Sequence, residues 1–137
     1  MVGNGFGWTR LVVATAMIAG MAAATGCSIT NGPNEIRLNA TALTAPATIA
    51  ANAPLTADVV VTRGACESFD RFDVMRSGSQ IVLTPIGRDE RPAGGACTLQ
   101  LILEHRTYTG MPPYGSSITI SVRRVDGSLL SQQVAVQ

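Results

Sequence analysis

The amino-acid sequence predicts an all-β domain of about seven short strands. Apolar and polar side chains alternate with a period of two in several runs after residue 35. Turn-forming residues such as Ser77-Gly78-Ser79 and Asp126-Gly127 separate these runs at regular intervals. No stretch after residue 27 places apolar residues at helical spacing, so a sheet-built domain is expected throughout.

The length and net charge of the chain limit the number of domains and the kinds of partner that it can have. A chain of 137 residues has room for one domain. The formal net charge is +1, and after residue 26 nine Arg balance nine Asp and Glu. Because nucleic-acid binding depends on a basic surface, the sequence predicts no nucleic-acid partner.

The first 27 residues differ from the rest in composition. Met1–Arg10 carries one positive charge, and Leu11–Ala24 is an unbroken run of apolar or small residues. A run of about 14 residues suits the core of a signal peptide but is too short to span a bilayer, which needs roughly 20. It ends in Ala24-Thr25-Gly26-Cys27.

This arrangement resembles the leader of bacterial lipoproteins, in which a lipobox ends at the modified Cys. The resemblance implies that Cys27 receives a diacylglyceryl group, that signal peptidase II cleaves before it, and that an acyl chain such as palmitate is added to the new amino terminus. Ser28, directly after this Cys, resembles the residue at that position in lipoproteins sent to the outer membrane rather than in those kept at the inner membrane. The expected location is therefore the outer membrane, on its periplasmic or surface face. The alternative is an ordinary cleaved signal peptide in which Cys27 is merely nearby.

The expected organisation is a signal peptide over 1–26, the lipidated Cys and a tether over 27–34, and a β domain over 35–137. Alternation places strands, in chain order, around residues 36–40, 55–61, 72–74, 81–85, 97–103, 118–122 and 130–136. A weaker edge segment surrounds Ile49, between Pro46 and Pro54. An exposed loop is expected at Gly87–Gly95, and a Gly/Pro-rich crossing at Tyr108–Gly115.

The three cysteines divide into one plus two. With Cys27 lipidated, Cys66 and Cys97 remain as an even pair in an exported protein, which predicts a disulfide. Such a bridge closes a loop of about 32 residues and contributes roughly 3–4 kcal/mol in the chain-entropy model. Cys97 is in phase with Leu99, Leu101 and Leu103, so its sulfur is expected to point into the core. Free or metal-binding thiols are the alternative, which the single His and the lack of a C-x-x-C spacing do not favour.

Together the strand count, the cysteine pair and the terminal hairpin resemble an immunoglobulin-like β-sandwich over about residues 35–137. The resemblance is to the architecture. The segment after the leader lacks Trp and its cysteines are close in sequence, so the bridge is expected to tie a loop to a strand rather than to join two sheet centres. A small Greek-key barrel fits the same pattern.

Few residues point to chemistry. His105 is the only histidine, and no nucleophile motif accompanies it, so a solvated His at the end of a strand is expected. Glu67, Asp70 and Asp73 form an acidic cluster, interpreted as a charged outer face rather than a calcium site. The sequence therefore predicts no enzyme, no cofactor and no metal.

The candidate binding residues lie in two segments. Arg88, Asp89, Glu90 and Arg91 occupy the expected loop, because binding residues of sandwiches gather in end loops. Tyr108 and Tyr114 belong to a segment rich in Pro and Gly; they are either interface residues or corner residues that pack on the core.

The function expected from the sequence is a lipid-anchored module of the bacterial cell envelope that binds or assembles without catalysis. Its partners are the membrane, through the anchor, and an envelope protein that the sequence does not identify. The alternative is an inhibitor or chaperone-like factor that acts through the 87–95 loop or an edge strand. Only this alternative ties the capture of a client to the loop. A hydrolase, with His105 as its base, has the least support.

Overall fold

A computed structural model describes residues 34–137 and shows an all-β chain of two sheets, which confirms the predicted fold class. The predicted signal peptide, Cys27 and most of the predicted tether lie outside the described residues. Residues 34–137 contain no helix, and hence none that could cross a membrane. The strands are β1 (Glu35–Arg37), β2 (Asn39–Thr44), β3 (Thr48–Ile49), β4 (Leu55–Gly64), β5 (Glu67–Ser77), β6 (Gln80–Asp89), β7 (Leu101–Gly110), β8 (Ser117–Arg123) and β9 (Leu129–Val136).

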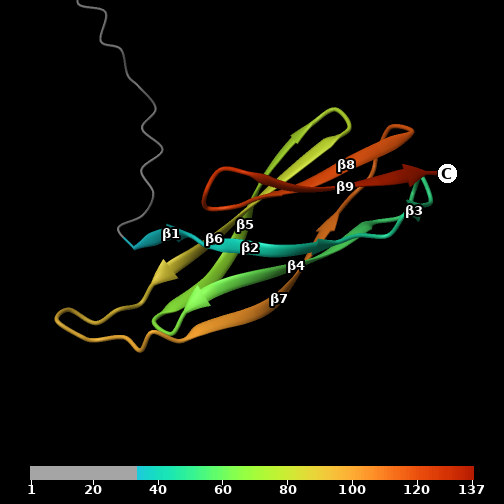
Figure 1. Ribbon diagram of the computed structural model, residues 1–137. Helices are drawn as coiled ribbons and strands as arrows, with labels where there is room; N and C mark the ends of the chain where they lie inside the picture. The colour runs from blue at the N-terminus through green and yellow to red at the C-terminus, as the bar shows by residue number, and fades with distance from the viewer. Residues whose placement is uncertain (1–33) are drawn as a thin grey trace, which may run out of the picture.

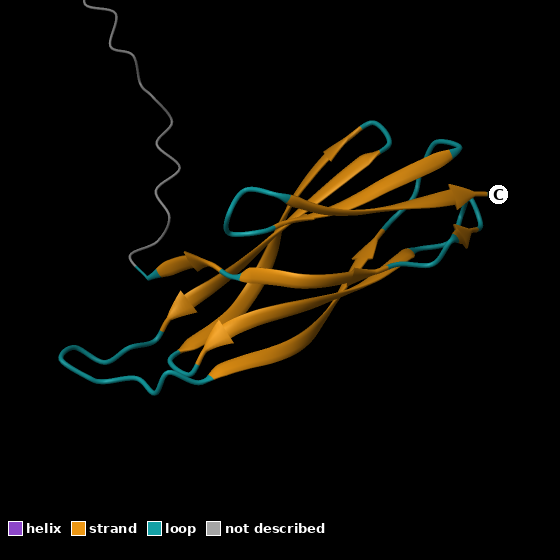
Figure 2. Ribbon diagram, viewed as in Figure 1, coloured by secondary structure: helices purple, strands orange, loops and turns teal. Residues whose placement is uncertain are grey.

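The two sheets form two layers (Figure 1). The smaller has the order β2-β4-β7, with every neighbour antiparallel. In the larger, β5 pairs with β6 along its length, while β1 and β8 pair with different parts of β6; β9 and β3 follow β8. The pairs β6–β8 and β3–β9 run parallel. Strands dominate the picture, and only short turns and one long loop interrupt them (Figure 2).

The first predicted strand is two strands in the structure, because the chain passes from one sheet to the other at Leu38. β1 pairs with β6, and β2 pairs with β4. Leu38 is 2% exposed, and its amide donates to the carbonyl of Pro85 at 3.0 Å. The crossing therefore joins the two layers at a buried residue. It is one reason why the structure has nine strands where the sequence predicts about seven.

The core lies between the sheets and is aliphatic, as the scarcity of aromatic residues requires. The predicted phase is confirmed for β4, β6 and β8, whose inward side chains are almost completely buried. The fully buried residues of these strands are Leu55, Ala57, Val59, Val61, Ile81, Leu83, Ile118, Ile120 and Val122. Their burial supplies most of the hydrophobic stabilisation of a domain this small.

The predicted phase of the leucine strand is wrong. β7 begins at Leu101 rather than at Cys97, and Leu101 and Leu103 are 75% and 65% exposed. The register with β4 decides which face is inside: buried Val61 lies opposite Glu104, so the side chain of Glu104 points inward and the leucines point outward.

Paired charges make this inverted phase possible. The Nε of Arg63 donates to Glu104 at 2.6 Å, and Nη2 of Arg106 donates to the same carboxylate at 2.5 Å. The Arg106 guanidinium also lies over the Phe69 ring of β5, 4.8 Å from its centroid. Hydrogen bonds from Arg63 and then Arg106 hold the pKa of Glu104 below its usual range. Charged side chains can thus occupy the half-buried edge between the sheets.

The predicted loop at Gly87–Gly95 is also placed differently. β6 continues to Asp89, and the connection to β7 runs over residues 90–100. Gly87 is buried within β6, where a Cβ would lie 2.5 Å from the carbonyl oxygen of Ser68 and 2.7 Å from the Leu38 side chain. This glycine therefore serves the close approach of neighbouring chain segments in the sheet, not a turn.

Candidate functional site

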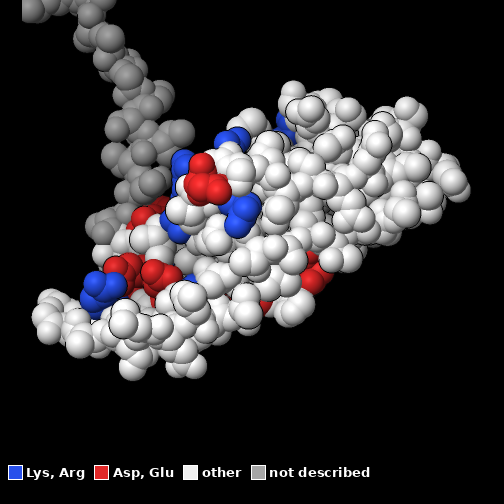
Figure 3. All heavy atoms as spheres, viewed as in Figure 1, with Lys and Arg blue, Asp and Glu red and all other residues white. Residues whose placement is uncertain are grey.

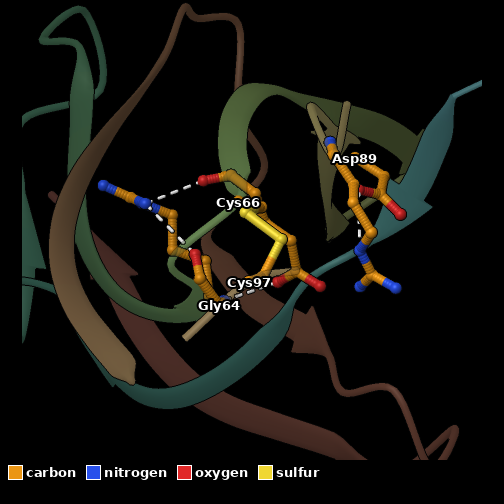
Figure 4. Close-up of a disulfide and its surroundings, with 7 residues drawn as sticks. Gly64, Cys66, Asp89 and Cys97 are labelled. Atoms are coloured by element: carbon orange, nitrogen blue, oxygen red, sulfur yellow. Dashed lines mark hydrogen bonds and ion pairs between the residues drawn. A yellow bond between two sulfur atoms is a disulfide. The ribbon is translucent and has the colours of Figure 1, made fainter. Parts of the chain in front are cut away.

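The disulfide predicted between Cys66 and Cys97 is present, with the two Cα atoms 5.8 Å apart. Cys66 lies in the two-residue turn between β4 and β5, and Cys97 lies in the long loop that precedes β7 (Figure 4). The expectation that the Cys97 sulfur points into the core is wrong, because Cys97 is half-buried and precedes the strand. The bridge instead ties the loop to a turn at one end of the domain.

Hydrogen bonds fix the turn on which the bridge is built. The Gly64 amide donates to Glu67 Oε2 at 2.6 Å, and Nη1 of Arg63 donates to the Glu67 carbonyl at 2.7 Å. The Glu90 amide donates to the Cys66 carbonyl at 2.8 Å. The bridge therefore joins the loop to a well-braced part of the sheet.

A cavity of about 430 Å³ surrounds the bridge, lined by residues 64–67 and 95–101 and by Arg91. Its lining includes glycines, alanines and the two bridged cysteines together with Leu99 and Leu101, and Glu67 and Arg91 supply its charged groups. One Glu67 oxygen is already held by Gly64. The cavity is thus an indentation at the tip of the domain, built around sulfur and small residues.

The four charged candidates are placed on or beside the end of β6. Arg88 and Asp89 belong to the strand, whereas Glu90 and Arg91 begin the loop. Arg88 lies 3.4 Å from an oxygen of Asp70, and Arg91 lies 4.0 Å from Asp89. Glu90 accepts a hydrogen bond from the Ser68 hydroxyl at 2.7 Å. Each of the four therefore has a neighbouring polar partner on the outer surface.

Arg71 brings together Asp70 and Asp73 of the predicted acidic cluster with Glu35, whereas Glu67, the third predicted member, instead accepts from the Gly64 amide. Its guanidinium donates to Glu35 and, at 2.9 Å each, to Asp70 and Asp73. The bond to Glu35, followed by those to Asp73 and Asp70, raises the pKa of the guanidinium above its usual value. Residues 34–137 contain no group of three or more His, Cys, Asp or Glu side chains that could hold a metal ion.

The two tyrosines are not brought together with the charged candidates. Tyr108 lies seven positions after Leu101 on β7, about 23 Å along a strand, and it packs against the core together with Tyr114. The Tyr114 hydroxyl donates to the Gly110 carbonyl at 2.7 Å and accepts from the Leu55 amide at 3.0 Å. Burial raises the pKa of Tyr108. Tyr108 lies on β7, so the predicted crossing begins only after Gly110, and Tyr114 lies on the connection to β8; both tyrosines pack on the core at the far end of the sandwich.

His105 lies within β7, not at its end as the sequence suggested. Its side chain is 73% exposed on the outer face of the smaller sheet, and Nδ1 lies 2.7 Å from Asp58 Oδ2. The pair links neighbouring strands across the solvent-facing side. It shares that face with the exposed leucines.

The leucine surface, defined as Leu99, Leu101 and Leu103, is the feature that the sequence reasoning assigned to the core. Leu99 is fully exposed, and all three lie at or beside the start of β7. A signal in the sequence could have found it: residues 92–103 contain no charged side chain, and Pro92-Ala93-Gly94-Gly95-Ala96 is small and neutral. The tip at the lower left of Figure 3 is correspondingly free of charged atoms, and charged atoms border it.

Removing the bridge is expected to destabilise the domain and to free this tip. Cys66→Ser combined with Cys97→Ser should lower the free energy of unfolding by about 3–4 kcal/mol, since the unfolded chain is no longer cross-linked. Urea unfolding, with the unmutated disulfide-bonded chain as reference, measures the loss. Limited proteolysis should then cut within residues 90–100 first. Equal stability with and without the bridge would show that the loop is held by its other contacts.

In comparisons with known proteins, no family model, no curated protein and no solved structure matches this chain. Function is therefore inferred from the placement of its own residues: a bridged, uncharged tip with exposed leucines at one end, and tyrosines packed on the core at the other.

Proposed function

We propose that the chain is a lipid-anchored protein of the bacterial cell envelope whose β domain serves as a non-catalytic binding or assembly module. The anchor is the lipid on Cys27, and residues 28–34 connect it to the domain. The outer membrane, on its periplasmic or surface face, is the favoured location. The protein partner is a component of the same envelope.

The distribution of the three cysteines carries the proposal. The bridge uses Cys66 and Cys97 and leaves Cys27 as the remaining thiol. Cys27 stands eight positions before Glu35, the first residue of β1, and it follows the apolar run of the leader. Stable disulfides are a property of exported proteins, which agrees with a leader that directs export.

The immunoglobulin-like class remains our proposal for the architecture. Two sheets that enclose one aliphatic core support it. The parallel pair β6–β8 departs from the antiparallel sheets of that class. An experimental structure with a different strand order would remove the assignment without affecting the anchor.

The mass of the intact protein, extracted from membranes with detergent, tests the proposed function. We expect the mass of residues 27–137, less two hydrogens for the bridge, plus a diacylglyceryl group and an amide-linked acyl chain. Treatment with a reductant should add two hydrogens. A mass that includes residues 1–26, or that ends before Cys27 without lipid, would contradict the anchor.

A further inference from the structure

The leucine surface consists of three exposed leucines at and just before the start of β7. Leu101 lies opposite Gly64 and Leu103 opposite Thr62, so neither faces a bulky apolar neighbour on β4. The adjoining tip, residues 92–100, is uncharged. Leu99 is fully exposed, and Leu101 and Leu103 are 75% and 65% exposed. Contiguous exposed leucines beside an uncharged loop are typical of a surface that is covered in use.

The domain begins at the same end. The carbonyl of Asn34 accepts a hydrogen bond from the Asp89 amide at 2.9 Å, and the next residue, Glu90, donates to the Cys66 carbonyl at 2.8 Å. Cys66 lies two residues after Gly64, which is paired with Leu101. A series of direct neighbours thus connects the first described residue to the leucine surface, and Figure 1 shows β1, the long loop and the start of β7 at one end of the molecule.

The short connection limits how far this end can lie from a lipid on Cys27. Seven residue steps separate Cys27 from Asn34, and they span at most about 25 Å when fully extended. The opposite end of the domain, where β7 ends at Gly110, is nine positions beyond Leu101 along the strand. The leucine surface is therefore on the membrane-proximal end of the anchored molecule.

We propose that the leucine surface docks on the bilayer that holds the chain, so that the bridged tip lies in the lipid headgroup region; this inference rests on the proposed lipid anchor. The position of the anchor favours lipid over a second copy or a protein partner, since the anchor brings this end to lipid and to no other surface. Leucine side chains partition into the boundary of the acyl chains, as they do for interfacial segments. Arg88 and Arg91, which are more than half exposed beside the tip, lie where lipid phosphates would meet them.

Anchoring makes a weak docking contact effective. Once the lipid on Cys27 is inserted, contact between the leucine surface and the bilayer is an intramolecular step with a high effective concentration. The consequence for function is orientation. The bridged end faces lipid, and the end with the β5–β6 turn and the C-terminus faces the aqueous phase and the partner protein (Figure 1).

The test uses tryptophan as a depth probe, because Trp8 is the only tryptophan of the chain and falls in the segment that cleavage before Cys27 removes; Trp8→Phe excludes emission from any uncleaved chain. The full chain with Trp8→Phe and Leu101→Trp is expressed with its lipid and reconstituted into vesicles of phosphatidylethanolamine and phosphatidylglycerol. We expect a blue-shifted emission that lipids brominated in the acyl chains quench. The matched control is Met111→Trp in the same Trp8→Phe background: Met111 is 63% exposed just past the other end of β7, about 33 Å away along the strand. Its tryptophan should be neither shifted nor quenched.

A second variant separates docking from anchoring. Adding Leu99→Ser and Leu103→Ser to the Leu101→Trp chain should abolish the quenching, while the protein still floats with the vesicles through its lipid. Leu103→Trp replaces Leu101→Trp as the probe if the latter lowers the unfolding midpoint.

Each remaining outcome decides the proposal. A lipidated chain that floats with vesicles and shows no quenching of the Leu101→Trp probe overturns the docking and leaves the anchor intact. If intact mass shows no lipid, the proposed function fails, and the docking that depends on the anchor fails with it. A blue shift that grows with protein concentration in the absence of vesicles identifies a second copy as the occupant and overturns the membrane proposal.

Discussion

Cys27→Ser is expected to move the protein completely from the membrane fraction to the aqueous fraction of the cell envelope. The hydroxyl cannot accept the diacylglyceryl group, so the chain loses every acyl chain of the proposed anchor. One acyl chain gives an association constant of only about 10⁴ M⁻¹, and each buried methylene contributes about 0.8 kcal/mol. Two or three chains therefore hold a protein at the membrane, whereas a protein without acyl chains is released. Ultracentrifugation of washed membranes, followed by immunodetection, measures the redistribution.

The other two cysteines provide the matched control for this experiment. Cys66→Ser with Cys97→Ser removes two thiols and the bridge but leaves Cys27 in place, so this variant should stay with the membrane. Retention in washed membranes of a Cys27→Ser chain that has lost residues 1–26 would end the anchor proposal. If that retention disappears when Leu99 and Leu103 are also replaced by Ser, the docking surface alone holds the domain.

Local alternation correctly predicted the strands that have one apolar, buried face and one more polar face. β4, β6 and β8 lie in the interior of the sheets, with neighbours on both edges, and their apolar faces are inside as expected. The same rule failed at β7, an edge strand of the smaller sheet. There the register with β4, set by long-range pairing, overrides the local pattern: Val61 faces Glu104, and the leucines are left outside.

The chemistry of the inward side chains explains why the failure could not be seen in the sequence. Glu104 and Arg106 have the composition of a solvent-exposed face. In the structure, Arg63 of β4 pairs with Glu104, and the Phe69 ring of β5 lies under Arg106. Those partners are 41 and 37 residues away in the chain, so no window of sequence shows them together. The disulfide was predictable because compartment and cysteine parity are properties of the whole chain. The position of the disulfide at the tip, rather than in the core, depends on the register between β7 and β4, which the sequence did not predict.

The error at Gly87 has a similar origin. A glycine beside Arg88-Asp89-Glu90-Arg91 has the composition of a loop, but Leu38 crosses between the sheets next to it, so that a side chain has no space there. The crossing also divides the first strand. Close packing of distant segments, rather than turn chemistry, accounts for both departures.

Leu83→Ala is expected to lower the free energy of unfolding by about 2–5 kcal/mol, because Leu83 is fully buried and its removal leaves a cavity. Leu103→Ala removes the same atoms from a side chain that is 65% exposed and should change stability by no more than about 0.5 kcal/mol. Urea unfolding of both variants in the Cys27→Ser background, with unchanged m-values, measures the difference. A cost for Leu103→Ala equal to that of Leu83→Ala would mean that the leucines of β7 face the core after all. The leucine surface would then not exist, and the lipid on Cys27 would be the sole contact with the membrane.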